Sequence, residues 1–217
     1  QAIKKLGYPK KDICFKPSKY SESGGTRGFR ILRRKNSAND IIFNQKPDSV
    51  EIDYETIKIA LKNSGTFSLL VMEFLPGDEF STYVFAEKGK MIHCISNLRQ
   101  KLDRYYSFEA ETIKNKKIEN MCKKIIEKLE LSYNVNNQFK NSKNKIPKLI
   151  EINPRIGGSI ILPSVSGINF PYLSVKQCLG EKITTPKKLK KTKMIRYLKE
   201  FFIQNTKNFE INKNYKI

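Results

Sequence analysis

Three polar side chains on two neighbouring predicted strands have the chemistry of a metal site. Glu151 and Asn153 lie two residues apart in the strand-like run 148–153, and Gln138 lies in the preceding run 134–140. Residues i and i+2 of a strand point to the same face, so a hairpin of these runs brings three side-chain oxygens together. Oxygen ligands suit Mg²⁺, which completes its shell with water and nucleotide phosphates. We therefore expect Gln138, Glu151 and Asn153 to hold a metal ion.

An arginine follows these oxygens in the motif E-I-N-P-R, and Gly157, Gly158 and Ser159 come directly after it. At this place Arg155 can neutralise a phosphoryl group during its transfer. A polar strand end with a proline-terminated turn is the alternative interpretation of the motif alone. The glycines and serine that follow favour the functional interpretation.

A Gly-rich segment near the N-terminus could enclose a phosphate. Lys16 and Pro17 precede a loop, residues 18–26, that contains Gly24 and Gly25, and Gly28 follows it. Glycines let backbone N–H groups converge on a phosphate, and a lysine at the strand end adds a positive charge. Neither the Walker A nor the dinucleotide pattern is present. Taken alone, a plain hairpin tip explains this loop equally well.

The run E-F-L-P-G-D-E, residues 73–79, has acids at both ends. A carboxylate such as Glu73 or Glu79 can accept hydrogen bonds from ribose hydroxyls, and exposed backbone groups of a strand edge can pair with an adenine edge. A hairpin corner with solvated acids is the other interpretation of this run.

Hydrophobic periodicity and turn residues predict the elements that carry these groups. We expect helices over 2–6, 53–63, 118–129 and 171–179, and strands over 12–17, 28–33, 68–75, 80–87, 91–96, 134–140 and 148–153. The third helix carries the apolar stripe Ile118, Met121, Cys122, Ile125, Ile126 and Leu129. The fold class is α+β, with a small hairpin-and-helix lid followed by a larger antiparallel sheet backed by helices.

Composition limits the class of protein. The chain has 217 residues, 39% of them hydrophobic, and its apolar runs are shorter than the roughly 20 residues of a membrane span. It opens without a charged-then-apolar leader. Four separated cysteines and one histidine disfavour a zinc site and are typical of reduced thiols in a cytoplasmic protein. We expect a cytoplasmic protein without a membrane partner.

The net charge of +21 raises the question of a nucleic-acid partner. Most of the lysines are dispersed along the chain, and the one dense block lies between Lys187 and Lys199. A solvated face is the favoured interpretation of this block, with a nucleic-acid or anionic-membrane patch as the alternative.

The order of K-P, a Gly-rich loop, E-F-L-P-G-D-E-F, a distant Q-F and E-I-N-P-R resembles the ATP-grasp superfamily. Within it the pattern is similar to the branch of the carbamoyl-phosphate synthetase large subunit, from Ala2 to Leu179. The resemblance implies a lid subdomain over 1–66, a nucleotide and metal subdomain over 67–180, and a basic extension over 181–217.

The same resemblance implies roles for the site residues. Lys16 would contact the nucleotide phosphates, beneath a loop that contains Gly24, Gly25 and Gly28. The backbone of Glu73, Phe74 and Leu75 would bind adenine, and Glu79 the ribose. Gln138, Glu151 and Asn153 would hold Mg²⁺, with Mn²⁺ as a possible substitute, and Arg155 and Lys16 would serve catalysis.

The implied activity is an ATP-dependent ligase that activates a carboxylate as an acyl phosphate for attack by an amine or similar nucleophile. The N-terminal domain of the superfamily has no counterpart in this sequence, so we expect either a fragment or a separate chain that supplies this domain. Arg99 and Lys101 match only loosely a basic pair that relatives carry. The alternatives are a nucleotide-binding module without independent catalysis and, less favoured, a basic nucleic-acid-binding protein.

Overall fold

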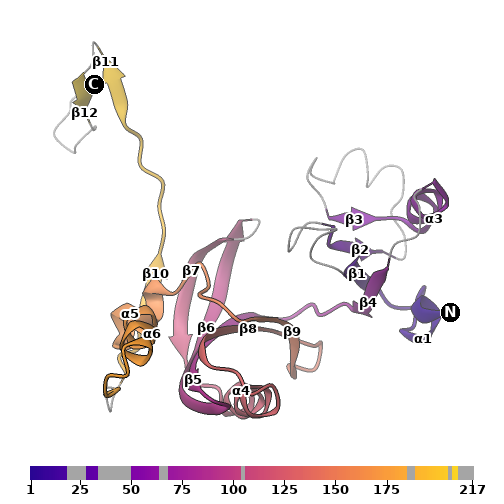
Figure 1. The fold of residues 1–217 in the computed structure, drawn as a ribbon. Coiled ribbons are helices and arrows are strands. Elements are labelled where there is room, and N and C mark those ends of the chain that lie inside the picture. Colours follow the sequence, from indigo (N-terminus) through magenta and orange to yellow (C-terminus); the bar gives the residue numbers. More distant parts are fainter. Residues whose placement is uncertain are drawn as a thin grey trace. The chain divides into compact units, whose positions relative to one another are not determined.

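The structure, a computed structural model, describes residues 1–18, 28–33, 50–63, 68–103, 106–184, 189–204 and 207–209. The chain divides into two compact units, Gln1–Leu75 and Pro76–Ile217, and each is described here by itself. The first contains α1 (Ala2–Lys5), β1 (Ile13–Pro17), β2 (Arg30–Leu32), β3 (Glu51–Ile52), α3 (Tyr54–Asn63) and β4 (Leu69–Glu73). The second contains β5 (Glu79–Glu87), β6 (Lys90–Asp103), β7 (Tyr106–Ile113), α4 (Lys116–Lys128), β8 (Tyr133–Asn141), β9 (Pro147–Asn153), α5 (Ile161–Ser166), α6 (Phe170–Cys178), β10 (Lys193–Ile195), β11 (Phe202–Gln204) and β12 (Lys207–Phe209) (Figure 1).

The first unit is built on a four-stranded sheet in the order β3-β2-β1-β4. β1 pairs antiparallel with β2, with Ile13 opposite Leu32, which confirms the expected hairpin. On its other side β1 pairs antiparallel with β4, where Lys16 lies opposite Leu70. Ile13, Phe15 and Leu32 are buried together because residues two apart on β1 share a face.

The strand that ends the first unit differs from the expected one. We predicted a buried strand over residues 68–75 in the second subdomain, but β4 pairs with β1 in the first unit, and Leu70 is 46% exposed. β4 is an edge strand with only one neighbour in its sheet, which leaves one of its edges unpaired among the described residues. The functional division between residues 1–66 and 67–180 stays a prediction.

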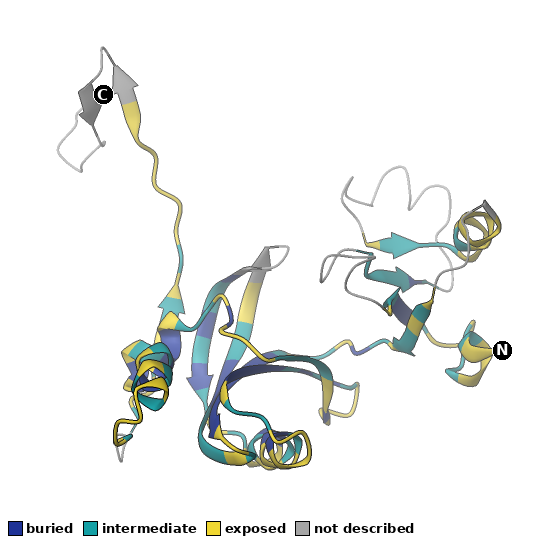
Figure 2. Cartoon of the chain, viewed as in Figure 1, coloured by how far each residue is buried: buried dark blue, intermediate teal, exposed yellow. Residues whose placement is uncertain are grey.

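A six-stranded sheet in the order β10-β7-β6-β5-β8-β9 forms the centre of the second unit, and every neighbouring pair is antiparallel. Alternate residues of β5 face opposite sides of it. Phe80 and Val84 pack with Ile118 of α4, whereas Tyr83 and Phe85 pack on the other side with α6. Helices therefore cover both faces, and the buried residues gather along the central strands (Figure 2). This architecture confirms the α+β class and the larger antiparallel sheet backed by helices.

α4 follows the predicted apolar stripe, with one correction. Asn115 caps the helix by accepting the backbone N–H groups of Lys117 and Ile118 at 3.1 and 3.2 Å. Ile118, Cys122 and Ile126 are fully buried, but Leu129 is 52% exposed. The helix ends at Lys128, so Leu129 sits at the C-cap, where the helical periodicity no longer directs it to the core.

Several elements have no counterpart among those expected from the sequence: β3, β7, α5 and β10 to β12. β10 is the most informative of them, because it lies inside the basic block that we expected to be a solvated extension. It adds an edge strand to the large sheet by pairing with β7. Among the described residues, no helix combines the length and the apolar character that a membrane crossing needs.

The α4 stripe leads to a paired test of the core. Ile126→Ala should lower the free energy of unfolding by about 2–5 kcal/mol, because it leaves a cavity between α4 and the sheet. Leu129→Ala, a similar truncation three residues further on, should change it by less than about 1 kcal/mol, since half of that side chain is already exposed. Urea denaturation of both variants measures the difference. Equal losses for the two variants would contradict the placement of Leu129 outside the core.

Candidate functional site

The hairpin of β8 and β9 brings the predicted metal ligands together. Gln138 lies directly opposite Glu151, and Asn136 lies opposite Asn153. Directly opposed residues of an antiparallel pair share a face, with Cβ atoms about 4.5–5.5 Å apart. The expected hairpin of these two runs is therefore confirmed, and the role of its polar residues as metal ligands stays a prediction.

A β-bulge lies beside this cluster. Gln138 pairs with Glu151 but Phe139 pairs with Leu149, so Ile150 is an extra residue in β9. A bulge twists its strand and changes the direction of nearby side chains, and bulges are frequent beside functional sites. Here the bulge keeps Phe139 in the core on the α4 side while Gln138 and Glu151 share the opposite face.

The polar face extends across four neighbouring strands. On β5, Ser81 lies opposite Gln138 of β8 on one side and opposite Asn97 of β6 on the other. Asn97, Ser81, Gln138 and Glu151 therefore form one row across the sheet, on the face turned away from α4. Polar side chains in place of apolar ones along this row distinguish a site from an ordinary core.

The next row of the same face carries compensated charges. Glu79 of β5 forms ion pairs with Arg99 of β6 and, at 3.7 Å, with Lys140 of β8. Arg99 also donates its Nε–H to the Ser107 hydroxyl at 2.7 Å. The carboxylate that the sequence assigned to ribose thus lies between two cations. Arg99, which matched relatives only loosely, belongs to this face, whereas Lys101 lies two residues further along β6, opposite Glu109 of β7.

Glu151 differs from Glu79 because its carboxylate has no partner within the described residues. It is half-buried and forms neither an ion pair nor a side-chain hydrogen bond there, although the chain carries a net charge of +21. Nearby amide atoms lack partners as well: Asn153 Nδ2, Asn136 Oδ1 and both side-chain polar atoms of Asn97 are buried without a hydrogen bond. Buried polar atoms are nearly always paired in proteins, so this group has the properties of a site that binds a polar or ionic ligand.

The residues fit a hard divalent cation. Gln138, Glu151 and Asn153 offer oxygen atoms from one shared face, and Mg²⁺ takes a few protein oxygens together with water and phosphate oxygens. Among the described residues, no cluster of three or more His, Cys, Asp or Glu side chains suits a metal. A site with a single carboxylate and amide oxygens therefore depends on further ligands from a bound nucleotide or from water.

The loop after β9 carries Arg155 at its exposed start. The backbone N–H of Arg155 donates to the Asn153 carbonyl at 2.8 Å, and its guanidinium donates to the Ile156 carbonyl at 3.0 Å. Gly157 is buried against the sheet, and a Cβ placed on it would lie 2.7 Å from Asn136 Nδ2. Only glycine allows the loop to approach the polar face this closely.

Tyr83 fixes the far side of the same loop. Its hydroxyl accepts the backbone N–H of Ser159 at 3.1 Å. Burial raises the pKa of Tyr83 above its ordinary value, which keeps the phenol neutral at physiological pH. Tyr83 also packs against Phe170 of α6, with ring centroids 6.4 Å apart, so the loop is attached to a rigid part of the sheet.

The remaining predicted residues lie in the first unit. Lys16 lies in β1 and is half-buried, and Gly28 adopts φ +78°, a backbone conformation that favours glycine. Glu73 ends β4, Leu75 is buried, and the Phe74 ring lies under the Arg33 guanidinium at 5.1 Å. Gly24 and Gly25 lie outside the described residues. The roles of these residues stay predictions.

Sequence reasoning missed Asn97 and Tyr83 as residues of this face, and it missed Arg196, which donates to the Gly158 carbonyl of the loop at 2.9 Å. For Asn97 a signal was present: the alternating run of β6 continues beyond residue 96, and Asn97 and Arg99 are two apart on the face of the site. Tyr83 and Arg196 have no such signal, because their contacts depend on long-range pairing of strands.

The two glycines of this loop provide a matched pair of variants. Gly157→Ala should destabilise the protein by about 1–3 kcal/mol, because the added methyl group overlaps the buried Asn136 amide and the Tyr83 ring. Gly158→Ala should change the free energy of unfolding by less than about 0.5 kcal/mol, since no neighbouring atom lies within 4 Å of its added Cβ. Chemical denaturation of both variants tests this. A Gly158→Ala loss as large as that of Gly157→Ala would contradict the close approach at Gly157.

Comparisons with solved structures show that this fold occurs in known proteins. The chain resembles the biotin carboxylase domain of Hydrogenobacter thermophilus 2-oxoglutarate carboxylase, with a TM-score of 0.63 and 16% identity over 99% of this chain and 52% of that one. It also resembles N5-carboxyaminoimidazole ribonucleotide synthetase from Thermotoga maritima, with a TM-score of 0.56 and 14% identity over 92% of this chain and 47% of that one. A third similar structure is L-amino acid ligase from Bacillus licheniformis, with a TM-score of 0.51 and 14% identity over 82% of this chain and 44% of that one.

The chain thus spans about half the length of the structures that it matches. No curated protein matches it. The family model "ATP-grasp in the biosynthetic pathway with Ter operon" matches residues 66–201, more than half of the chain and including the whole polar face described above. This chain belongs to that ATP-grasp family.

Proposed function

We propose that this chain carries the nucleotide and metal sites of an ATP- and Mg²⁺-dependent ligase that joins a carboxylate to an amine or similar nucleophile. One observation carries the proposal: a half-buried carboxylate, Glu151, without an ionic partner among the described residues of a strongly basic protein, beside two amide side chains on the same face. A carboxylate in such a place is expected to be paired, and a divalent cation supplies the missing charge.

In this proposal Gln138, Glu151 and Asn153 hold Mg²⁺ through their oxygens, with Mn²⁺ as a substitute. When bound, the ion neutralises the phosphate charge that develops during phosphoryl transfer. Arg155, exposed at the end of β9, contributes a fixed positive charge for the transferred group. The residue set fits the ion because it offers only oxygen ligands from one face.

The nucleotide contacts in this proposal come from the motif resemblance. The motif resemblance assigns Lys16, Gly24, Gly25 and Gly28 to the phosphates. It assigns the backbone of Glu73, Phe74 and Leu75 to adenine and Glu79 to the ribose.

The proposed reaction balances in two steps. A substrate carboxylate oxygen attacks the γ-phosphorus, the bond from that phosphorus to the bridging oxygen breaks, and ADP leaves. The nucleophile then attacks the acyl carbon, phosphate leaves with the bonding electrons, and the nucleophile loses a proton. The protein contributes mainly positioning and charge neutralisation by Arg155 and Lys16.

The similar structures support this class of reaction. The Hydrogenobacter thermophilus domain was solved with MgADP and bicarbonate, and N5-carboxyaminoimidazole synthase from Aspergillus clavatus with ADP and 5-aminoimidazole ribonucleotide. The finer expectation, membership of the branch similar to the carbamoyl-phosphate synthetase large subunit, rests on the motif order. It stays a prediction, as do the cytoplasmic location and a separate chain that supplies the N-terminal domain.

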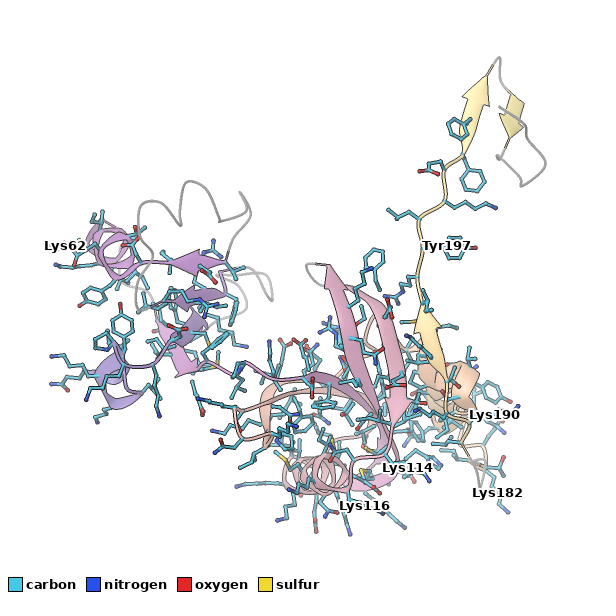
Figure 3. The ribbon with its side chains drawn as sticks, turned by 180° about the vertical axis from the view of Figure 1, so that it is seen from behind. Lys62, Lys114, Lys116, Lys182, Lys190 and Tyr197 are labelled. Carbon is cyan, nitrogen blue, oxygen red and sulfur yellow. The ribbon has the colours of Figure 1, made fainter. Side chains whose placement is uncertain are left out.

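Two lysines of the basic block have acidic partners. Lys191 and Lys193 of the basic block form ion pairs with Glu111 and Glu109, at 3.6 and 2.9 Å. Lys114, Lys116, Lys182 and Lys190 are exposed at the surface of the second unit (Figure 3). At these two positions the charge of the basic block is compensated, and a nucleic-acid partner stays the less favoured alternative.

A nucleotide-binding module without independent catalysis remains the second candidate, because the chain spans about half of its structural relatives. A phosphate-release assay with Mg·ATP and a panel of carboxylic acids separates the two candidates. Release stimulated by one acid supports the ligase. Nucleotide binding without any stimulated release across the panel supports the module.

The metal assignment makes a direct prediction. Glu151→Gln should weaken Mg·ATP binding at least about 10-fold, the lower end of what even outer-shell changes cost a metal site. Its stability without nucleotide should be equal to that of wild type or higher, since no partner among the described residues is lost and an uncompensated half-buried charge is removed. Titration calorimetry measures the binding.

The matched control is Glu119→Gln, which removes the same charge from a half-buried position on the surface of α4, where Glu119 pairs with the exposed Lys116 at 3.6 Å. It should leave the affinity for Mg·ATP unchanged. Equal affinities for wild type and Glu151→Gln would refute the assignment of Glu151 as a metal ligand.

A further inference from the structure

Arg196 connects three segments that are far apart in sequence. Its backbone N–H donates to the Phe108 carbonyl at 2.8 Å, and its Nη1 donates to the Ser107 carbonyl at 3.0 Å. Its Nη2 donates to the Gly158 carbonyl at 2.9 Å. The guanidinium thus spans from the start of β7 to the loop that follows β9.

The strand pairing of the basic block determines where Arg196 lies. β10 pairs with β7, with Lys193 opposite Glu111 and Ile195 opposite Glu109. The Thr192 N–H donates to the Thr112 hydroxyl at 3.0 Å just before the strand. Arg196 is the next residue after β10, and its backbone bond to Phe108 continues the ladder. The register of β10 against β7 therefore fixes the backbone position of Arg196, from which its guanidinium extends.

The loop that Arg196 contacts is the one that carries Arg155. On its inner side Gly157 packs against Asn136, and the Ser159 N–H is bound by the Tyr83 hydroxyl. On its other side the Gly158 carbonyl is bound by Arg196. The loop is thus held from the sheet and from the C-terminal segment at the same time.

We propose that Arg196 is a positioning residue of the site, which holds the loop of residues 156–159 so that Arg155 faces the transferred phosphoryl group. The inference rests on the proposed function, since it assigns Arg155 to that group. Arginine suits this role because its planar fork donates to two carbonyls at fixed angles, whereas lysine offers a single point charge on a flexible stem. The basic segment after residue 181 is in this respect part of the site.

Among the described residues beyond Arg196, none forms a comparable hydrogen bond with the loop. Tyr197 is 79% exposed, and its side chain points away from the sheet in Figure 3. Lys193, three residues before Arg196 on the same segment, binds Glu109 on the surface and does not touch the loop. Lys193→Ala is therefore a matched control for the loss of a cation from this segment.

Hydrogen exchange of the purified protein, measured without nucleotide, tests whether Arg196 holds the loop of residues 156–159. Arg196→Lys keeps the charge and most of the stem, and it should speed exchange of the amides of residues 157–162 by about tenfold, the effect of losing one charge-assisted hydrogen bond. Arg196→Ala should do the same or more. Exchange in α4 should stay unchanged in Arg196→Lys, which shows that the fold is intact, and Lys193→Ala should resemble wild type. Unchanged exchange of the loop in both Arg196 variants would overturn the proposal.

A double-mutant cycle tests the consequence for ligand binding. Arg155→Ala should reduce the preference for Mg·ATP over Mg·ADP by about tenfold, because Arg155 meets the terminal phosphate. In a protein that keeps Arg155, Arg196→Lys should also reduce the preference for Mg·ATP over Mg·ADP. In the Arg155→Ala background, Arg196→Lys should have no further effect on this preference, because Arg196 acts through Arg155. Additive losses would overturn the positioning role, as a direct contact of Arg196 with the nucleotide would produce them. If wild type binds no Mg·ATP, the proposed function fails, while the exchange experiment still decides whether Arg196 holds the loop.

Discussion

The antiparallel pairing of β8 with β5 and β9 is the constraint on which the site depends. It aligns Ser81, Gln138 and Glu151 in one row and places Tyr83, Asn136 and Asn153 in the next. The alternate residues of β5 and β8 fill the core beneath α4, so a shift of one residue would bury the polar row and expose the core. The hydrophobic packing of Phe80, Val84 and Phe139 thereby fixes where the polar side chains point.

Two carboxylates on this face show how the chain distributes charge. Glu79 is enclosed by Arg99 and Lys140, which hold it in one orientation and leave its negative charge compensated. Glu151 has no such partner among the described residues, although lysines and arginines are abundant in the chain. Leaving one half-buried acid uncompensated costs free energy in the empty protein. In our account a cation bound together with a nucleotide recovers that energy, so affinity for the metal and for ATP should be linked.

The local sequence was sufficient for the elements with strong patterns. The α4 stripe and the β8–β9 hairpin follow from periodicity and turn residues, and with them the proximity of Gln138 to Glu151. Leu129 was wrongly placed in the core because the helix ends one residue before it. β10 could not be found from its sequence, because a three-residue strand inside a lysine-rich block acquires its structure only from pairing with β7. The role of Arg196 depends on that pairing, so this role could not be predicted from the sequence either. Gly24 and Gly25 lie outside the described residues, and their assignment still rests on the motif.

The most direct test of the account is where a metal ion binds together with nucleotide. Crystals grown with ADP and Mn²⁺, a substitute for Mg²⁺ that scatters anomalously, locate the ion independently of the nucleotide density. We predict an anomalous peak coordinated by the Glu151 carboxylate and the side-chain oxygens of Asn153 and Gln138, with phosphate oxygens of ADP completing the shell. A nucleotide-bound ion elsewhere in the protein, with Glu151 left without a ligand, would contradict the account.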